Sequence, residues 1–169
     1  GVRLEAAAWP VTGTYRIQSS EDLVALVMAL DARNRTGAIP INTLCIPYLP
    51  YARQDRVAVP GDPLAIEVLG RILRAGGITN VTSIDVHSEK AVPQMAASGI
   101  SLLSASPLPF IRAYIDHLRM SGQIEKFVLV SPDKGALGKT LGYMKGMMDL
   151  ADMRGVVVCT KVREPTTGR

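Results

Sequence analysis

Residues 41–56 read Ile-Asn-Thr-Leu-Cys-Ile-Pro-Tyr-Leu-Pro-Tyr-Ala-Arg-Gln-Asp-Arg, and this stretch decides the expected fold. Its first six residues form a short apolar run of the length typical of a buried strand. Two prolines follow, and then side chains that are able to bind a ligand. A strand that leads directly into such a loop is typical of open α/β sheets, where ligands bind beyond the carboxyl ends of the strands.

The rest of the chain alternates between short apolar runs and helix-length segments. Further strands are predicted at residues 15–18, 81–84, 100–103, 127–130 and 156–159. Helices are predicted between them, at about 19–35, 62–76, 89–98, 106–120 and 135–152. Strands without polar alternation, separated by helices, indicate parallel sheets covered by helices on both faces. The predicted fold class is therefore α/β.

Local signals set the predicted starts of three helices. Ser19-Ser-Glu-Asp22 has the form of a capping box, in which the first and last side chains bond each other's backbone N–H groups. Asp62-Pro63 and Ser106-Pro107 each place an N-cap residue before a proline at the first helical position. The segment 97–109 is rich in Ser, Pro and Gly and is the best candidate for a boundary between lobes.

The composition is typical of a soluble globular protein. The 169 residues are 47% hydrophobic, 20% charged and 5% aromatic, which argues against disorder. The apolar stretch Leu23 to Leu30 is far too short to span a membrane, so no membrane partner is expected. The formal net charge is +4, but the basic residues form no run and are not interleaved with aromatics. A nucleic-acid partner is therefore not expected either.

The two cysteines indicate the compartment. Cys45 and Cys159 each lie inside an apolar, strand-like run, which predicts buried and reduced thiols rather than a disulfide. Reduced thiols are typical of the cytosol, so a cytoplasmic protein is expected.

Side chains that can carry chemistry gather after four of the predicted strands. These clusters are Arg53–Arg56, Asp85–His87, Asp133–Lys134 and Lys161–Arg163. Each lies at the carboxyl end of a predicted parallel strand, where loops face a crevice and helix N-termini point into it. Carboxylate and imidazole groups in two clusters are able to hold a divalent cation, and the arginines and lysines are able to neutralise phosphate oxygens. Together the clusters predict a polyphosphate site with magnesium.

Each cluster also has a purely structural interpretation. Asp85 and His87 are equally compatible with a structural hydrogen-bonding pair, and Tyr48 and Tyr51 are more typical of packing residues than of base-stacking ones. Gly138-Lys139-Thr140 resembles the end of a phosphate-binding P-loop. However, Asp133 stands where that motif needs glycine, so a position on a helix flank is expected instead.

Four segments carry a resemblance to a known family. Tyr51-Ala-Arg-Gln-Asp-Arg56 is highly specific, and it is followed in order by Ile84-Asp-Val-His-Ser88, Val130-Ser-Pro-Asp133 and Lys161-Val-Arg163. In sequence and spacing, over roughly residues 15–169, the chain resembles ribose-phosphate pyrophosphokinase, also called phosphoribosyl-pyrophosphate synthetase.

The resemblance implies an activity and a set of site residues. The family uses Mg²⁺ to transfer the diphosphoryl group of ATP to the C1 hydroxyl of ribose 5-phosphate, giving phosphoribosyl pyrophosphate and AMP. By position it implies ATP binding by Arg53, Gln54, Asp55 and Arg56. It likewise implies a magnesium site at His87, Asp133 and Asp85, and catalytic roles for Lys161 and Arg163 on a mobile loop.

The resemblance also implies an architecture and an assembly. Two phosphoribosyltransferase-like lobes are expected, an N-terminal one over residues 1–105 and the start of a C-terminal one over residues 106–169. The second lobe is expected to be incomplete, because the sequence stops before the family's ribose 5-phosphate loop. A homo-oligomer, a hexamer in this family, is implied. The alternative is a non-catalytic regulatory subunit that binds nucleotide, a class that the family includes.

Overall fold

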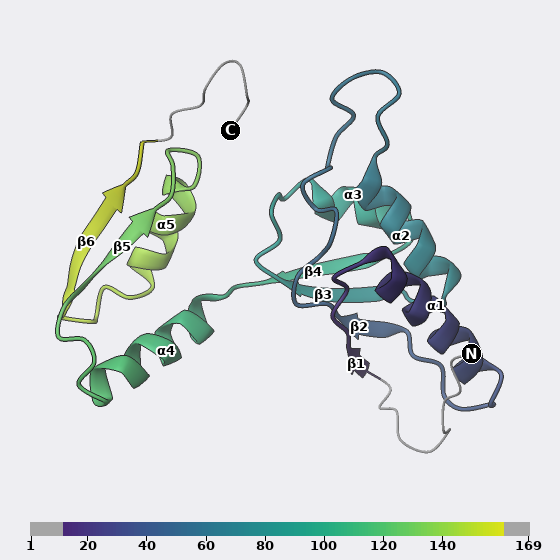
Figure 1. The fold of residues 1–169 in the computed structure, drawn as a ribbon, viewed down its shortest axis with the longest axis horizontal. Coiled ribbons are helices and arrows are strands. Elements are labelled where there is room, and N and C mark those ends of the chain that lie inside the picture. Colours follow the sequence, from purple (N-terminus) through teal and green to yellow (C-terminus); the bar gives the residue numbers. More distant parts are fainter. Residues whose placement is uncertain (1–11, 161–169) are drawn as a thin grey trace. The chain divides into compact units, whose positions relative to one another are not determined.

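The chain folds as two units, which are described separately. A computed structural model describes residues 12–160 and divides the chain into Gly1–Ser106 and Pro107–Arg169 (Figure 1). Within residues 12–160 no helix is both long enough and apolar enough to cross a membrane.

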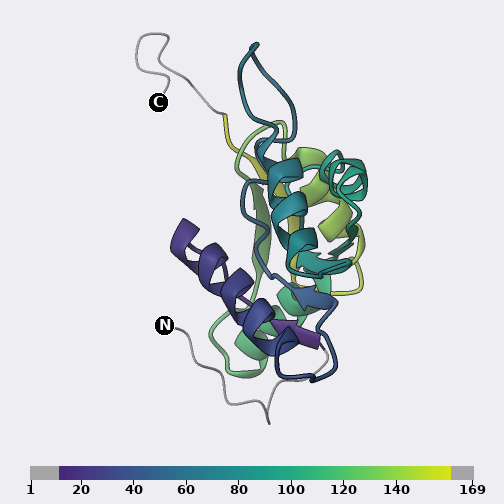
Figure 2. The ribbon, with the colours of Figure 1, turned by 90° about the vertical axis from the view of Figure 1, so that its right-hand side faces the viewer.

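The first unit is built on a four-stranded parallel sheet. Its strands are β1 (Thr12–Thr14), β2 (Thr43–Cys45), β3 (Asn80–Ile84) and β4 (Ser101–Ala105), and they lie side by side in chain order. The three connections contain α1 (Ser20–Asn34), α2 (Ala65–Ala75) and α3 (Ala91–Ala97) (Figure 2). Because all three strand pairs are parallel, every carboxyl end lies at the same edge of the sheet, as the predicted ligand edge requires.

The core of this unit lies against one face of the sheet. Leu44, Val81 and Leu102 are aligned across β2, β3 and β4, and all three are buried. They pack with apolar side chains from the helices, including Leu26, Leu30, Ile66, Leu69, Leu73 and Met95. On the opposite face Leu103 is 61% exposed. The prediction of a sheet covered on both faces is therefore wrong for the described part of this unit. Right-handed crossovers between strands in chain order place successive helices on the same face.

The second unit has a smaller parallel sheet. It comprises α4 (Leu108–Met120), β5 (Phe127–Ser131), α5 (Leu137–Lys145) and β6 (Met153–Val158), with β5 paired to β6. Ile115, Met147 and Leu150 form its buried core. Arg119 joins α4 to Asp152 with Nη2 2.6 Å from Oδ2, and Arg112 pairs with Asp149.

The start of α1 follows the sequence prediction. The Ser19 hydroxyl accepts a hydrogen bond from the backbone N–H of Asp22 at 3.2 Å, and the Asp22 carboxylate accepts from the N–H groups of Gln18 and Ser19. The capping box is therefore confirmed. These hydrogen bonds hold the pKa of Asp22 below its ordinary value, and the bond from the Gln18 N–H contributes most.

Other boundaries differ from the predictions. The first strand is Thr12–Thr14 rather than 15–18; Tyr15 still donates its N–H to the Cys45 carbonyl at 2.9 Å, but the chain then leaves the sheet for α1. Asp62 is not a cap: its carboxylate accepts from the Val59 N–H at 3.1 Å, so a local turn uses it, and α2 begins only at Ala65.

Two further predictions fail at the ends of elements. The N-cap position of α4 is Pro107 rather than Ser106, and the helix start has no side-chain cap bond. The helix predicted to run to residue 152 ends at Lys145, with Gly146 as its C-cap. Cys45 is half-buried and Cys159 is exposed, so the prediction of two buried thiols is wrong for Cys159; both are free of disulfides, as predicted.

Candidate functional site

The candidate site in the first unit is formed by the loops that follow β2 and β3. Since these strands are paired and parallel, their following loops leave the sheet at the same edge. Each loop contains a residue in the left-handed backbone region, Tyr51 with φ 61° and Asp85 with φ 52°. Within residues 12–160 they are the only non-glycine residues with positive φ. Such strain is often retained at functional sites.

Backbone hydrogen bonds fix the loop of residues 51–56. The Gln54 N–H donates to the Tyr51 carbonyl at 2.9 Å and closes a turn. The Gln54 carbonyl then accepts from the N–H of Ile66, in the first turn of α2, at 3.4 Å. The loop is therefore attached to the helix that follows it, and its side chains project from a fixed backbone.

Asp55 joins this loop to its neighbours. Its side chain is only 3% exposed, and its carboxylate accepts hydrogen bonds from the Ser88 hydroxyl and from Arg56 Nε at 3.2 Å. The Asp55 carbonyl accepts from Gln94 Nε2 in α3 at 3.3 Å. The pKa of Asp55 lies below its ordinary value, chiefly because of the hydrogen bond from Ser88 and to a smaller extent because of the charge of Arg56. Asp55 thus links its own loop to the loop after β3 and to α3, which makes it a positioning residue for its neighbours.

The neighbours of Asp55 face solvent. Arg53, Gln54 and Arg56 are all exposed. The Nε of Arg56 is used by Asp55, whereas the guanidinium as a whole carries five N–H donors. Two arginines and an amide on a fixed loop suit the bidentate recognition of phosphate oxygens.

The loop after β3 presents two of the predicted metal ligands. Asp85 and His87 are both exposed, and the backbone between them is attached to β4. There the Asp85 N–H donates to the Ala105 carbonyl at 2.9 Å, and the Val86 N–H donates to the Ser104 hydroxyl at 3.1 Å. In the described part of the chain no group of three or more His, Cys, Asp or Glu is arranged to hold a metal. Magnesium, however, usually takes one or two carboxylates and keeps several waters, so an exposed Asp85 fits such an ion.

The third predicted metal ligand, Asp133, belongs to the second unit and closes the turn between β5 and α5. Its Oδ1 accepts from the Ala136 N–H at 2.9 Å, and its carbonyl accepts from the buried Ser131 hydroxyl at 2.8 Å. One carboxylate oxygen therefore already has a structural role.

Gly138-Lys139-Thr140 lies inside α5, with the Thr140 hydroxyl bonded to the Ala136 carbonyl, so it is helix and not a P-loop. Lys161 and Arg163 lie outside the described residues.

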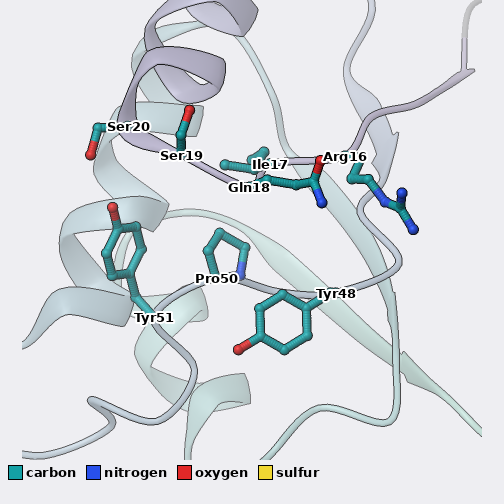
Figure 3. A pocket seen from close by; sticks show the side chains of 8 residues that line it. All are labelled: Arg16, Ile17, Gln18, Ser19, Ser20, Tyr48, Pro50 and Tyr51. Carbon is teal, nitrogen blue, oxygen red and sulfur yellow. The ribbon is translucent and has the colours of Figure 1, made fainter.

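Sequence reasoning missed a cavity beside the loop of residues 51–56. It has a volume of about 590 Å³ and is lined by the segment 16–20 and by Tyr48, Pro50 and Tyr51 (Figure 3). Tyr48 is 69% exposed and Tyr51 40% exposed, so the interpretation of both as packing residues is wrong. The available signal was two tyrosines in a proline-containing loop directly after a strand.

Comparisons with known proteins find relatives of the part of the chain that carries this site. Residues 11–77 match the family model for the N-terminal domain of ribose phosphate pyrophosphokinase. Ribose-phosphate pyrophosphokinase of Bacillus subtilis is 32% identical over 129 residues, which is 73% of this chain and 38% of that protein. The Aeropyrum pernix protein of the same name is 31% identical over 80% of this chain and 43% of its own length. Over most of its length this chain is therefore similar to ribose-phosphate pyrophosphokinases.

A solved member of the family has the same fold. Phosphoribosylpyrophosphate synthetase from Mycobacterium smegmatis matches 90% of this chain with a TM-score of 0.65 at 20% identity, and 48% of that chain is covered. This chain spans about two fifths of the length of the Bacillus subtilis and Aeropyrum pernix proteins. The residues that match the family model include α1, β2, the loop 51–56 and α2. The best-defined part of the candidate site therefore lies within the part of the chain that the family model covers.

Proposed function

We propose that this chain carries the ATP-binding part of a ribose-phosphate diphosphokinase. The reaction is the Mg²⁺-dependent transfer of the diphosphoryl group of ATP to the C1 hydroxyl of ribose 5-phosphate, giving phosphoribosyl pyrophosphate and AMP. The observation that carries the proposal is the loop 51–56, whose arginines face solvent while Asp55 is buried and holds the loop in place. By its resemblance to the family, the protein is proposed to be cytoplasmic and to assemble as a hexamer.

In this proposal Arg53 and Arg56 neutralise the oxygens of the triphosphate. Transfer of a phosphoryl or diphosphoryl group needs little covalent help from the protein, because in-line positioning and charge neutralisation supply most of the catalysis. A loop attached to α2, α3 and the loop after β3 helps to meet the positioning requirement, since its backbone does not have to be ordered at the moment of binding.

The residues at the end of β3 fit a hydrated divalent cation. Asp85 and His87 would hold the ion or its waters. A bound Mg²⁺ neutralises phosphate oxygens and polarises the phosphorus that is attacked. Lys161 and Arg163 are proposed to stabilise the charge that develops as the AMP oxygen leaves.

The proposal is tested by calorimetric titration of the chain with a non-hydrolysable ATP analogue in the presence of Mg²⁺. Saturable binding is expected, and Arg53→Ala is expected to weaken it by about tenfold or more, because a hydrogen bond to a charged group contributes about 1.5–3 kcal/mol. Arg154→Ala removes an exposed arginine from the second unit and serves as the matched control. A wild-type chain that does not bind the analogue, or equal affinities for Arg53→Ala and Arg154→Ala, would contradict the proposal.

A further inference from the structure

The turn that carries Asp85 and His87, the two predicted cation ligands after β3, is strained. Asp85 follows β3 directly and has a left-handed backbone, with φ 52°. Residues other than glycine rarely adopt this conformation, although aspartate tolerates it better than most. Such a turn persists only where the surrounding structure holds it. The hydrogen bonds around Asp85 therefore identify what keeps the two ligands in place.

The beginning of the turn is held by the end of β4. The Asp85 N–H donates to the Ala105 carbonyl at 2.9 Å, and the Val86 N–H donates to the Ser104 hydroxyl at 3.1 Å. The first bond joins two backbone groups, so it does not depend on the side chain at position 105. The second bond depends on the side chain of Ser104, and it fixes a peptide group that lies between the two predicted ligands.

Ser104 stands where the strand pattern would place an apolar side chain. Successive side chains of a strand point to opposite faces of the sheet, so Ser104 shares its face with the buried Leu102. Ser104 itself is exposed, at the rim of the core. Its hydroxyl adds no apolar contact to the core, whereas the Val86 N–H uses it as an acceptor.

The neighbouring strand has the same arrangement. Ser83 lies opposite Ser104 in the register of β3 and β4, and its buried hydroxyl donates to the Pro47 carbonyl at 3.4 Å. Pro47 lies just beyond the end of β2. Each serine therefore bonds the loop that follows the preceding strand. Ser83 bonds the loop after β2, and Ser104 bonds the loop after β3.

The far end of the turn is closed by bonds to the start of α3. The Ser88 hydroxyl accepts from the Lys90 N–H at 3.2 Å, and the Ser88 carbonyl accepts from the Ala91 N–H at 3.1 Å. His87 thus lies between Val86, which is bonded to β4, and Ser88, which is bonded to the start of α3. Only the bond at Val86 depends on a side chain of β4.

We propose that Ser104 is a positioning residue for the divalent-cation site. Its hydroxyl holds the left-handed turn, and with it the separation of Asp85 from His87, so that both side chains serve one hydrated cation. Groups that orient metal ligands without touching the metal are a regular part of metal sites, and their loss lowers metal affinity. The inference rests on the proposed function, which assigns the cation to Asp85 and His87.

Mn²⁺ is the probe for this site, because carboxylate and water ligands suit it and because it broadens the NMR signals of nearby groups. The chain has two histidines, and His117, in α4 of the other unit, reports unspecific binding. On the full chain without nucleotide, Mn²⁺ should broaden the imidazole signals of His87 at lower concentrations than those of His117. Ser104→Ala should raise the concentration that broadens His87 by about two- to tenfold, as expected for one lost hydrogen bond, and leave His117 unchanged.

Three further variants identify the hydroxyl as the cause. Ser104→Thr keeps a hydroxyl and should bind Mn²⁺ like the wild type. Ser104→Val has the same branched shape without the hydroxyl, also suits a strand, and should bind as weakly as Ser104→Ala. Ser101→Ala removes an exposed serine hydroxyl from the other end of β4 and is the matched control. Circular dichroism melting checks that each variant keeps its fold.

The outcomes separate this inference from the proposed function. Equal broadening of His87 in Ser104→Ala and Ser101→Ala, or equal broadening in Ser104→Thr and Ser104→Val, would overturn the role of Ser104 alone. If Mn²⁺ broadens His87 of the wild-type chain no more readily than His117, the cation assignment in the proposed function fails, and this inference fails with it. The phosphate loop is tested independently, by the titration of Arg53→Ala with the ATP analogue.

Discussion

The two units differ in how much apolar surface they bury. Among the described residues, the core of the first unit contains eighteen buried residues on one face of a four-stranded sheet. The core of the second contains three, beside a two-stranded sheet. On that sheet Val128, Val130 and Val157 remain about half-exposed (46%, 56% and 50%). Sheets of two strands are marginal by themselves. The candidate nucleotide loop thus lies on the unit that has its own core, and a rigid support is what a positioned site requires.

The largest expected effect comes from opening the larger core. Leu69 is 1% exposed and packs in α2, which begins directly after the candidate loop. Leu69→Ala should lower the free energy of unfolding of the first unit by about 2–5 kcal/mol, since it removes apolar contacts and leaves a cavity. Urea denaturation followed by circular dichroism measures the change. A loss below about 1 kcal/mol would show that this core is not closely packed.

Hydrogen exchange compares the two sheets directly. The backbone N–H groups of β3, at the centre of its sheet, should exchange on the order of a hundredfold more slowly than those of β5 and β6, because opening the smaller core exposes less apolar surface. The measurement is native-state exchange followed by NMR or mass spectrometry. Equal protection of the two sheets would remove the distinction between the units.

The buried carboxylate of the loop should make part of the stability of the first unit depend on pH. The pKa of Asp55 is lowered from its ordinary 3.8, so its charged form stabilises the fold above pH 3.8, and this stabilisation is lost as the pH falls through the lower, folded-state value. Asp55→Asn should therefore have a lower free energy of unfolding than the wild type at pH 7, and the loss should be smaller than that of Leu69→Ala. In acid the free energies of unfolding of Asp55→Asn and of the wild type should converge.

The matched control for that measurement is Asp31→Asn. Asp31 also pairs with an arginine, at 2.7 Å from Arg35, but both side chains are largely exposed, so solvent screens the pair and a smaller change is expected. Thermal melts between pH 2 and pH 7 give both comparisons. If the Asp31 variant loses more stability at pH 7 than the Asp55 variant, burial is not what makes Asp55 important.

The smallest effect is expected on the exposed face of the second sheet. Val130→Thr keeps the branched side chain and adds a hydroxyl at a position that is already 56% exposed. The free energy of unfolding should change by no more than about 0.5 kcal/mol, as is usual for exposed sites. A clear destabilisation in the same urea experiment would mean that this face is covered in solution.

Local sequence patterns predicted most elements but not all of their ends. The capping box at Ser19 was predictable, because both partners lie within one helical turn. The failure of Asp62 to cap α2 was not predictable, because the nearby Val59 N–H competes for the same carboxylate. The sequence pattern is the same whether Asp62 caps the helix or closes this turn. The one-sided core also escaped prediction, since it depends on the order of the strands in the sheet rather than on any single segment.

The sequence alone determined the α/β alternation and the polar residues that follow four of the strands, because hydrophobic periodicity and turn chemistry act over a few neighbouring residues. It also carried the resemblance to the ribose-phosphate pyrophosphokinases, through a short specific segment. Only the tertiary structure decided that Asp55 is buried while Arg53 is exposed, and that Tyr48 lines a cavity with Gln18. These properties depend on contacts such as that of Gln94 with Asp55, 39 positions away, which form only when parallel strands bring distant loops to the same edge.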